Sequence, residues 1–199
     1  GAWDDDEITI LRHPEKQLLD RALILASYHD YSFVTFSGHG HHVKGLRIDE
    51  TRLCINDTEE VSVYSLNSGS RCSFIVADAC RKVSYIDAEK SARDFSTALA
   101  AAELSLKPDR AACKKLFLDM VKTADLGPTY VYSCGLDEAA EDAPSFSSRL
   151  VEAGESWAEQ GIPGWYPTHD AFQVAKAKIH DKNPQQNPEY DAAQRKIHP

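Results

Sequence analysis

The stretch Ser73-Phe74-Ile75-Val76-Ala77 is a continuous apolar run that ends at Asp78-Ala79-Cys80. Short runs of this kind are typical of strands that are buried on both faces of a parallel sheet. Earlier in the chain, Ser32-Phe33-Val34-Thr35-Phe36 predicts a strand that ends at Ser37-Gly38-His39-Gly40. Later, Thr129-Tyr130-Val131-Tyr132-Ser133 predicts another. Apolar strands followed by polar turns therefore recur along the sequence.

Helical patterns separate these strands. Pro14 stands where a helix can begin, and Leu18, Leu19, Leu23 and Leu25 give that helix a broad apolar face. Further helices are expected near residues 91–105, 109–124, 146–159 and 169–180. We also expect a strand at 7–11 and an extended segment at 183–188, while 43–70 fits either strand or short helix. Alternation of strands and helices predicts an α/β fold, a mainly parallel sheet with helices on both faces.

The composition limits the function classes. With 199 residues, the chain fits a single domain over 1–199. Its net charge of −9 and scattered basic residues argue against a nucleic-acid partner. No apolar run suits a membrane span, and no secretory signal is visible. The five cysteines form no CxxC pair, which indicates reduced thiols in a cytoplasmic setting. The ends, Gly1 and Pro199, suggest a fragment or subunit of a larger protein.

Ligands of parallel α/β sheets bind at the carboxyl ends of the strands. That rule predicts that the turns 37–40, 78–80 and 133–135 lie along one edge of the sheet. A histidine and a cysteine then end two of the strands. A thiolate attacks carbonyl carbons well, an imidazole can exchange the proton, and glycines admit a substrate backbone. The edge therefore has the residue types of a cysteine hydrolase.

Two strings at this edge resemble known signatures. Phe36-Ser37-Gly38-His39-Gly40 and Val76-Ala77-Asp78-Ala79-Cys80-Arg81-Lys82 are similar to the His-Gly and Asp-x-Cys motifs of caspase-like cysteine peptidases, above all of paracaspases and bacterial orthocaspases. Segments 132–141, 146–150 and 186–190 also look like later parts of these domains. The resemblance implies a caspase-like sandwich. The family's first strand and helix have no counterpart here, so a regulatory domain or partner chain is expected to supply them.

The resemblance also implies roles for individual residues. Cys80 would be the nucleophile and His39 its acid–base partner. The backbone N–H groups of Gly40 and Cys80 would form the oxyanion hole. Asp78 and Glu141 would line the S1 pocket and bind an arginine or lysine of the substrate. The resemblance thus predicts cleavage after Arg or Lys rather than after Asp.

Plainer interpretations stand beside these roles. Cys80 fits a buried small hydrophobe, and Asp78 fits a carboxylate that only braces its turn. The acidic run that holds Glu141 fits a solvated loop, with Asp137 and Glu138 as alternatives to Glu141. Three other features have competing interpretations, namely the histidines 39, 41 and 42 as a zinc site, the acids 4–7 as a calcium site, and the bases in 83–128 as self-cleavage sites. We expect no metal, structural thiols at the other cysteines, and ordinary helices in 83–128.

The favoured hypothesis is a cysteine endopeptidase without cofactors, bacterial and cytoplasmic, that acts on protein or peptide substrates within a regulated system such as antiviral defence. The alternative is a catalytically silent caspase-like scaffold for protein–protein interaction, which the intact His39 and Cys80 argue against. A metal-dependent hydrolase built on the histidines ranks third. Neither a nucleic acid nor a membrane is expected as a partner.

Overall fold

The structure is a computed structural model that describes residues 3–45, 47–85, 109–124, 126–141, 145–161 and 164–192. The helix expected near 91–105 lies outside these residues.

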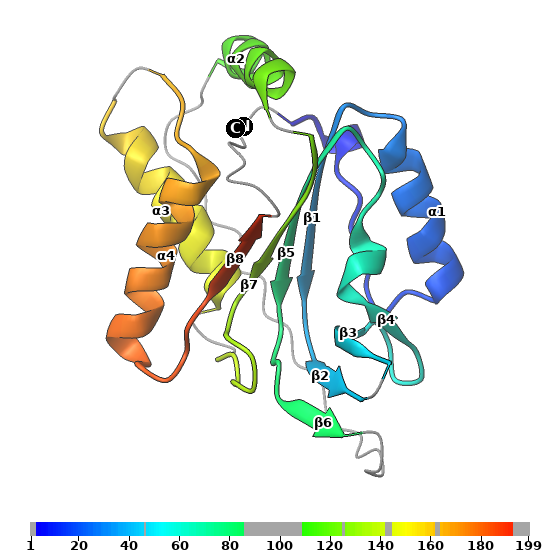
Figure 1. Cartoon of the computed structure of the whole chain (residues 1–199). Helices are drawn as coiled ribbons and strands as arrows, with labels where there is room; N and C mark the ends of the chain where they lie inside the picture. Colours follow the sequence, from blue (N-terminus) through cyan, green and yellow to red (C-terminus); the bar gives the residue numbers. More distant parts are fainter. Residues whose placement is uncertain are drawn as a thin grey trace.

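A four-stranded sheet forms the centre of the fold (Figure 1). Its order is β1 (Tyr31–Ser37), β5 (Cys72–Asp78), β7 (Gly127–Tyr132) and β8 (Glu189–Ala192). The first three strands are parallel and β8 runs antiparallel to β7. The three strands predicted around residues 32–36, 73–77 and 129–133 are therefore confirmed. The antiparallel edge strand β8 was not expected.

Helices cover both faces of this sheet, as predicted (Figure 1). Helix α1 (Lys16–Ser27) lies on one face, and α3 (Phe146–Glu159) and α4 (Thr168–Lys182) lie on the other. Helix α2 (Arg110–Thr123) crosses the end of the sheet where the parallel strands begin. The α/β architecture is thus confirmed. No helix within the described ranges combines the length and the apolar character needed to cross a bilayer.

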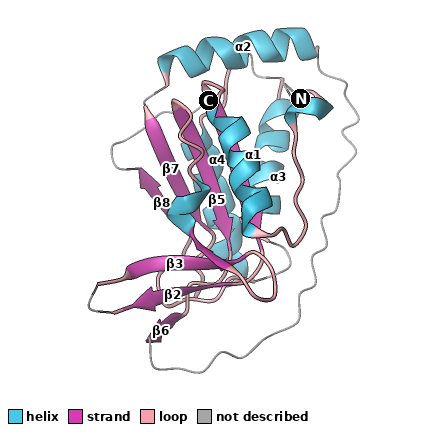
Figure 2. Cartoon of the chain, turned by 90° about the vertical axis from the view of Figure 1, so that its right-hand side faces the viewer, coloured by secondary structure: helices cyan, strands magenta, loops and turns pink. Residues whose placement is uncertain are grey.

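The ambiguous region 43–70 contributes strands to a second sheet (Figure 2). Its order is β4 (Glu60–Ser62), β3 (Asp49–Cys54), β2 (Gly40–Lys44) and β6 (Val83–Tyr85). The short 3-10 helix η2 (Val63–Leu66) follows β4. This sheet lies at the end of the central sheet where β1 and β5 finish, so it adjoins the predicted functional edge.

The strand predicted at 7–11 is wrong. A 3-10 helix, η1 (Asp5–Glu7), occupies its start, and the next four residues form no strand. The Glu7 carboxylate accepts the backbone N–H of Asp4. The ammonium group of Lys114 on α2 donates to the carboxylates of Asp4 and Glu7. Hydrogen bonds to Lys114 lower the pKa of Asp4, and a hydrogen bond from the Asp4 N–H, followed by one from Lys114, lowers that of Glu7. This acidic end is therefore held by cations of the chain itself.

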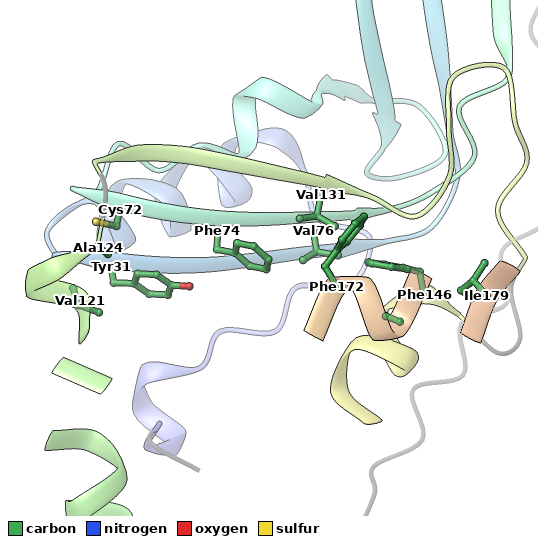
Figure 3. Close-up of a cluster of buried hydrophobic side chains, with 11 residues drawn as sticks. Tyr31, Cys72, Phe74, Val76, Val121, Ala124, Val131, Phe146, Phe172 and Ile179 are labelled. Atoms are coloured by element: carbon green, nitrogen blue, oxygen red, sulfur yellow. The ribbon is translucent and has the colours of Figure 1, made fainter. Parts of the chain in front are cut away.

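Two apolar clusters pack on the two faces of the sheet, and β5 supplies both. Phe74 and Val76 point toward α3 and α4, where they meet Phe146 and Phe172 (Figure 3). The alternate residues Ile75 and Ala77 join the cluster on the other face. All seven residues of β5 are buried, which explains why its sequence lacks polar alternation.

Candidate functional site

The register of the central sheet brings the His39 and Cys80 turns together. Ser37 pairs directly with Asp78 in the parallel ladder of β1 and β5. His39 and Cys80 each follow two residues later, so the backbone positions of the two residues lie at the same level of the edge. The N–H of Gly38 donates to the Asp78 carbonyl at 3.1 Å, which holds the turns side by side. The adjacency predicted from strand order is thus present in the backbone.

Gly40 packs directly against the cysteine turn. A Cβ atom at this position would lie 3.0 Å from Ala79 Cβ and 3.1 Å from the Cys80 carbonyl oxygen. It would also lie 2.9 Å from the Arg52 carbonyl oxygen. Because these neighbours are backbone atoms or a short rigid side chain, only glycine fits here without a shift.

The N–H of Gly40 points away from β3. The His39 carbonyl accepts the N–H of Cys54 on β3, so along β2 the N–H groups of Gly40 and His42 face the opposite edge. His42 accordingly donates to the Lys82 carbonyl at 2.9 Å. The Gly40 N–H therefore faces the segment that carries Cys80, which is the direction that an oxyanion donor requires.

The Cys80 thiol is half-buried and contacts the loop after β7. The N–H of Ala140 donates to Cys80 Sγ at 3.3 Å, and Sγ lies 3.7 Å from the Ala140 carbonyl oxygen. Cys80 is therefore not a fully buried hydrophobe. It lies at the junction of the turn after β5 and the loop 133–141.

The third predicted turn, 133–135, also reaches this edge. The Ala79 N–H donates to Ser133 Oγ at 3.1 Å, and Cys134 Sγ lies 3.4 Å from the Ala79 carbonyl oxygen. Cys134 is fully buried, and burial raises the pKa of its thiol to about 12. Cys134 thus packs beneath the turn as a neutral thiol, as expected of a structural cysteine.

Asp78 is 5% exposed and braces the start of α3. Its Oδ2 accepts the N–H of Ser147 at 2.8 Å, one residue inside the helix that Phe146 begins. A carboxylate at a helix N-terminus is stabilised by the unpaired N–H groups and the helix dipole. The bracing role is therefore present in the structure. The predicted S1 role stays a prediction.

The acids of the loop 133–141 differ in their contacts. Glu138 accepts the N–H of Gly135 and both the N–H and the side-chain amide of Asn187, at 2.7–2.9 Å. Partial burial would raise the pKa of Glu138, but the hydrogen bonds from Asn187 and Gly135 bring it below its ordinary value. Asp137 accepts the N–H of Val83 at 3.1 Å. Both acids therefore hold backbone in place.

Glu141 is exposed, and its carboxylate accepts the side-chain amide of Asn183 at 2.9 Å. It directly follows Ala140, so its backbone adjoins the residue that contacts the Cys80 thiol. Of the three acids considered in this loop, Glu141 is the one without a hydrogen bond from a backbone N–H to its carboxylate among the described residues. It is the best placed of the three to meet a ligand.

Arg81 is a supporting residue that the sequence analysis missed. Its guanidinium is buried, donates to Thr51 Oγ1 at 3.1 Å and to the Cys134 carbonyl at 3.2 Å, and pairs with Glu189. It also lies 4.0 Å from the centre of the Tyr132 ring. Arg81, which directly follows Cys80, therefore links the Cys80 turn to β3, β7 and β8. The one sequence signal was its place inside the Asp-x-Cys-Arg-Lys string.

Gln186 fixes the loop from the other side. Its fully buried side chain donates to the Ser133 carbonyl at 2.8 Å and accepts the N–H of Glu141 at 3.2 Å. The segment 183–188, predicted as extended, thus fastens both ends of the loop that reaches Cys80. The burial of this polar side chain depends on tertiary contacts, so the sequence pattern does not predict it.

The histidines after position 39 have separate environments. His42 is buried, with Nε2 2.6 Å from Asp49 Oδ1 and Nδ1 3.4 Å from Thr51 Oγ1. His41 instead lies with Cys54 and Glu60, and their ligand atoms all fall within 4.8 Å of one another. The histidines at 41 and 42, weighed above with His39 as a zinc site, therefore lie in different surroundings, and His41 lies beside residues that are distant in sequence.

Several of the basic residues considered as self-cleavage sites lie on α2. Residues 86–108 lie outside the described part of the chain. Of the bases beyond them, Arg110, Lys114 and Lys122 lie on α2, where each forms an ion pair with an acidic residue. The helix predicted at 109–124 is confirmed, with bounds at Arg110 and Thr123.

Comparisons with known proteins leave the family open. No protein-family model matches the chain, and no curated protein does. Among solved structures, a crystal structure of protein GSU0716 from Geobacter sulfurreducens is similar, with a TM-score of 0.49 and 12% sequence identity. The match covers 88% of this chain and 72% of that one. A likeness at this level carries no argument about activity.

Proposed function

We propose that the chain is a cysteine endopeptidase of the caspase-like kind, with Cys80 as nucleophile and His39 as acid–base partner. One observation carries the proposal. Ser37 pairs directly with Asp78, so the turns that carry His39 and Cys80 lie side by side at the carboxyl ends of adjacent parallel strands. The tight packing of Gly40 on the Cys80 turn supports the same arrangement, because it leaves little freedom between the two turns.

The proposed reaction follows from these groups. Cys80 Sγ, as thiolate, forms a bond to the scissile carbonyl carbon, and the carbon–nitrogen bond then breaks. His39 gives its proton to the leaving amine and afterwards takes one from the water that hydrolyses the thioester. The N–H groups of Gly40 and Cys80 would stabilise the oxyanion. Neither a cofactor nor a metal ion takes part in this proposed reaction.

The proposed substrate is a peptide or protein with Arg or Lys at P1. Asp78 lies two residues before the nucleophile and has a second carboxylate oxygen beyond the one that accepts the Ser147 N–H. Glu141 lies next to the residue that contacts the thiol. Two carboxylates at one site favour a guanidinium or ammonium group. A neutral or acidic P1 residue would leave at least one of them unpaired.

A peptidase assay tests the proposal. Fluorogenic peptides with Arg, Lys or Asp at P1 are incubated with the wild type, Cys80→Ala and His39→Ala. The matched controls are Cys113→Ser and His29→Ala, which change the same residue types elsewhere. We expect hydrolysis after Arg or Lys, a loss of at least 10³-fold in both site variants, and wild-type rates in both controls. Hydrolysis that persists in Cys80→Ala would reject the cysteine mechanism.

The setting that we propose is a bacterial, cytoplasmic, regulated protein, for example in antiviral defence. The position of β1 at an edge of the central sheet supports a partner element, because its outward backbone groups pair with no described strand. Phe33 on this strand is half-exposed. If no peptide is cleaved and binding to a protein partner survives in Cys80→Ala, the scaffold alternative replaces the enzyme.

A further inference from the structure

The second sheet carries a group of potential metal ligands that the proposed reaction does not use. His41 on β2, Cys54 at the end of β3 and Glu60 at the start of β4 have their ligand atoms within 4.8 Å of one another. His41 Nε2 lies 3.8 Å from Glu60 Oε2, and Cys54 Sγ lies 3.9 Å from Glu60 Oε1. Three different donor atoms from three strands therefore converge on one point.

Strand register builds this convergence into the fold. Leu53 pairs with Val61 between β3 and β4, and both side chains are buried in the core. Since side chains alternate along a strand, their neighbours Cys54 and Glu60 point to the opposite face. These two also pair directly, and the pairing of Gly40 with Leu53 sets β2 beside them. The three ligands thus share the outer face of a registered antiparallel sheet.

The spacing is close to that of a loaded site. A tetrahedral zinc ion with ligand bonds of about 2.0–2.3 Å holds its ligand atoms roughly 3.5 Å apart. The observed separations reach at most 4.8 Å, so the ligand atoms would have to move closer by up to about 1.3 Å, which small changes of side-chain torsion can supply. His41 and Glu60 are each 28% exposed, so an ion can reach them from solvent and they can still adjust.

The charges around the group also suit a cation. Arg52 lies opposite His41 on the same face, but its guanidinium is paired with Glu50 at 2.6 Å. The Glu60 carboxylate and a Cys54 thiolate would together neutralise a divalent ion. Binding would form three bonds from protein to metal and release the Cys54 proton to solvent.

We propose that His41, Cys54 and Glu60 bind one zinc-class divalent cation on the outer face of the second sheet, with a solvent-facing fourth position. Imidazole with thiolate selects borderline-soft ions, and hard ions such as Mg²⁺ and Ca²⁺ prefer oxygen ligands alone. This metal site goes beyond the proposed peptidase activity, and it lies beside the proposed peptidase site. The Cys54 N–H donates to the carbonyl of His39, so an ion here would tie the strand that follows His39 to β3 and β4.

Cobalt titration tests the site, because a thiolate bound to Co²⁺ gives a charge-transfer absorption that carboxylates and imidazoles do not. The titration uses the full chain in a Cys80→Ala background, which removes the other partly exposed thiol of the functional edge. Among the remaining cysteines, Cys72 and Cys134 are fully buried, so Cys54 and Cys113 are the accessible thiols. Cys113→Ser is therefore the matched control for Cys54→Ser.

We expect one Co²⁺ per chain with this absorption, displaced by Zn²⁺ but not by excess Mg²⁺ or Ca²⁺. Cys54→Ser should abolish the band, His41→Asn and Glu60→Gln should weaken Zn²⁺ binding at least tenfold, and Cys113→Ser should change nothing. Circular dichroism checks that each variant is folded. A band that survives Cys54→Ser, disappears with Cys113→Ser, or never forms would overturn the proposal. None of these readouts depends on peptide hydrolysis, so failure here is distinct from failure of the peptidase.

Discussion

Replacing Gly40 with alanine tests the packing that joins the histidine and cysteine turns. The added Cβ would lie 3.0 Å from Ala79 Cβ, whereas carbon atoms in contact prefer about 3.5–4.0 Å. It would also press on the carbonyl oxygens of Arg52 and Cys80 at 2.9 and 3.1 Å. The two turns must therefore separate by about 0.5–1 Å. Overpacking of this kind costs about 1–3 kcal/mol.

Urea denaturation measures this cost. With a slope of about 2 kcal/mol per M, a loss of 2 kcal/mol lowers the midpoint by about 1 M. If the chain is the proposed peptidase, a displacement of up to about 1 Å between His39 and Cys80 should also lower kcat by about 100-fold. The control is Gly154→Ala inside α3, where nothing lies within 4 Å of the new Cβ. That change should raise stability by about 1 kcal/mol. An unchanged midpoint in Gly40→Ala would refute the close approach of the turns.

Three further changes probe the site. Asp78→Asn keeps an oxygen for the Ser147 N–H but loses the charge at the N-terminus of α3, so the free energy of unfolding should fall by about 1 kcal/mol or less while kcat/KM at P1 Arg falls about 30-fold, or about 2 kcal/mol; equal loss at a neutral P1 residue would contradict the S1 role. The lowered pKa of Glu138 contributes stability above pH 4.5 that is lost as the pH falls through the folded-state pKa. Urea denaturation should therefore show that the difference in free energy of unfolding between wild type and Glu138→Gln shrinks as the pH is lowered. A difference that stays constant with pH would contradict the stabilising role of the Glu138 charge. Iodoacetamide followed by mass spectrometry should label Cys72 and Cys134 only after unfolding, because both are fully buried; labelling of either in the native chain would contradict the fold.

Much of the central fold was predictable because burial leaves a direct mark on sequence. β5 is buried at every position, and its apolar run predicted its bounds to within one residue at each end. The helix predicted at 146–159 has those bounds in the structure, since Ser145 caps it through the Ser148 N–H and Phe146 anchors it in the core. Local signals sufficed for these elements because local and tertiary preferences agree.

The second sheet and β8 were not predictable for the opposite reason. Strands such as β4, with three residues, are too short to show a period of two. β6 gains its place by pairing with β2, where His42 pairs with Val83, 83 − 42 = 41 residues later. The wrong strand at 7–11 shows the converse, because an apolar pattern forms no strand without a partner, and Ile8 and Ile10 stay exposed. Pairing between distant segments decides these elements.

The same distinction separates the site residues that sequence predicted from those it missed. His39 and Cys80 each follow a seven-residue strand of the central sheet, so strand order alone predicted that their turns are neighbours. Arg81, Gln186 and the group around Cys54 depend on which loop faces which strand, and nothing local encodes that. For Asp78, the sequence offered bracing and substrate binding as alternatives, yet the two do not exclude each other. A carboxylate has about four acceptor positions, and the Ser147 N–H uses one of them. The N-terminus of α3 holds one carboxylate oxygen of Asp78 in place, and the other oxygen is the acceptor that the proposed P1 arginine would meet.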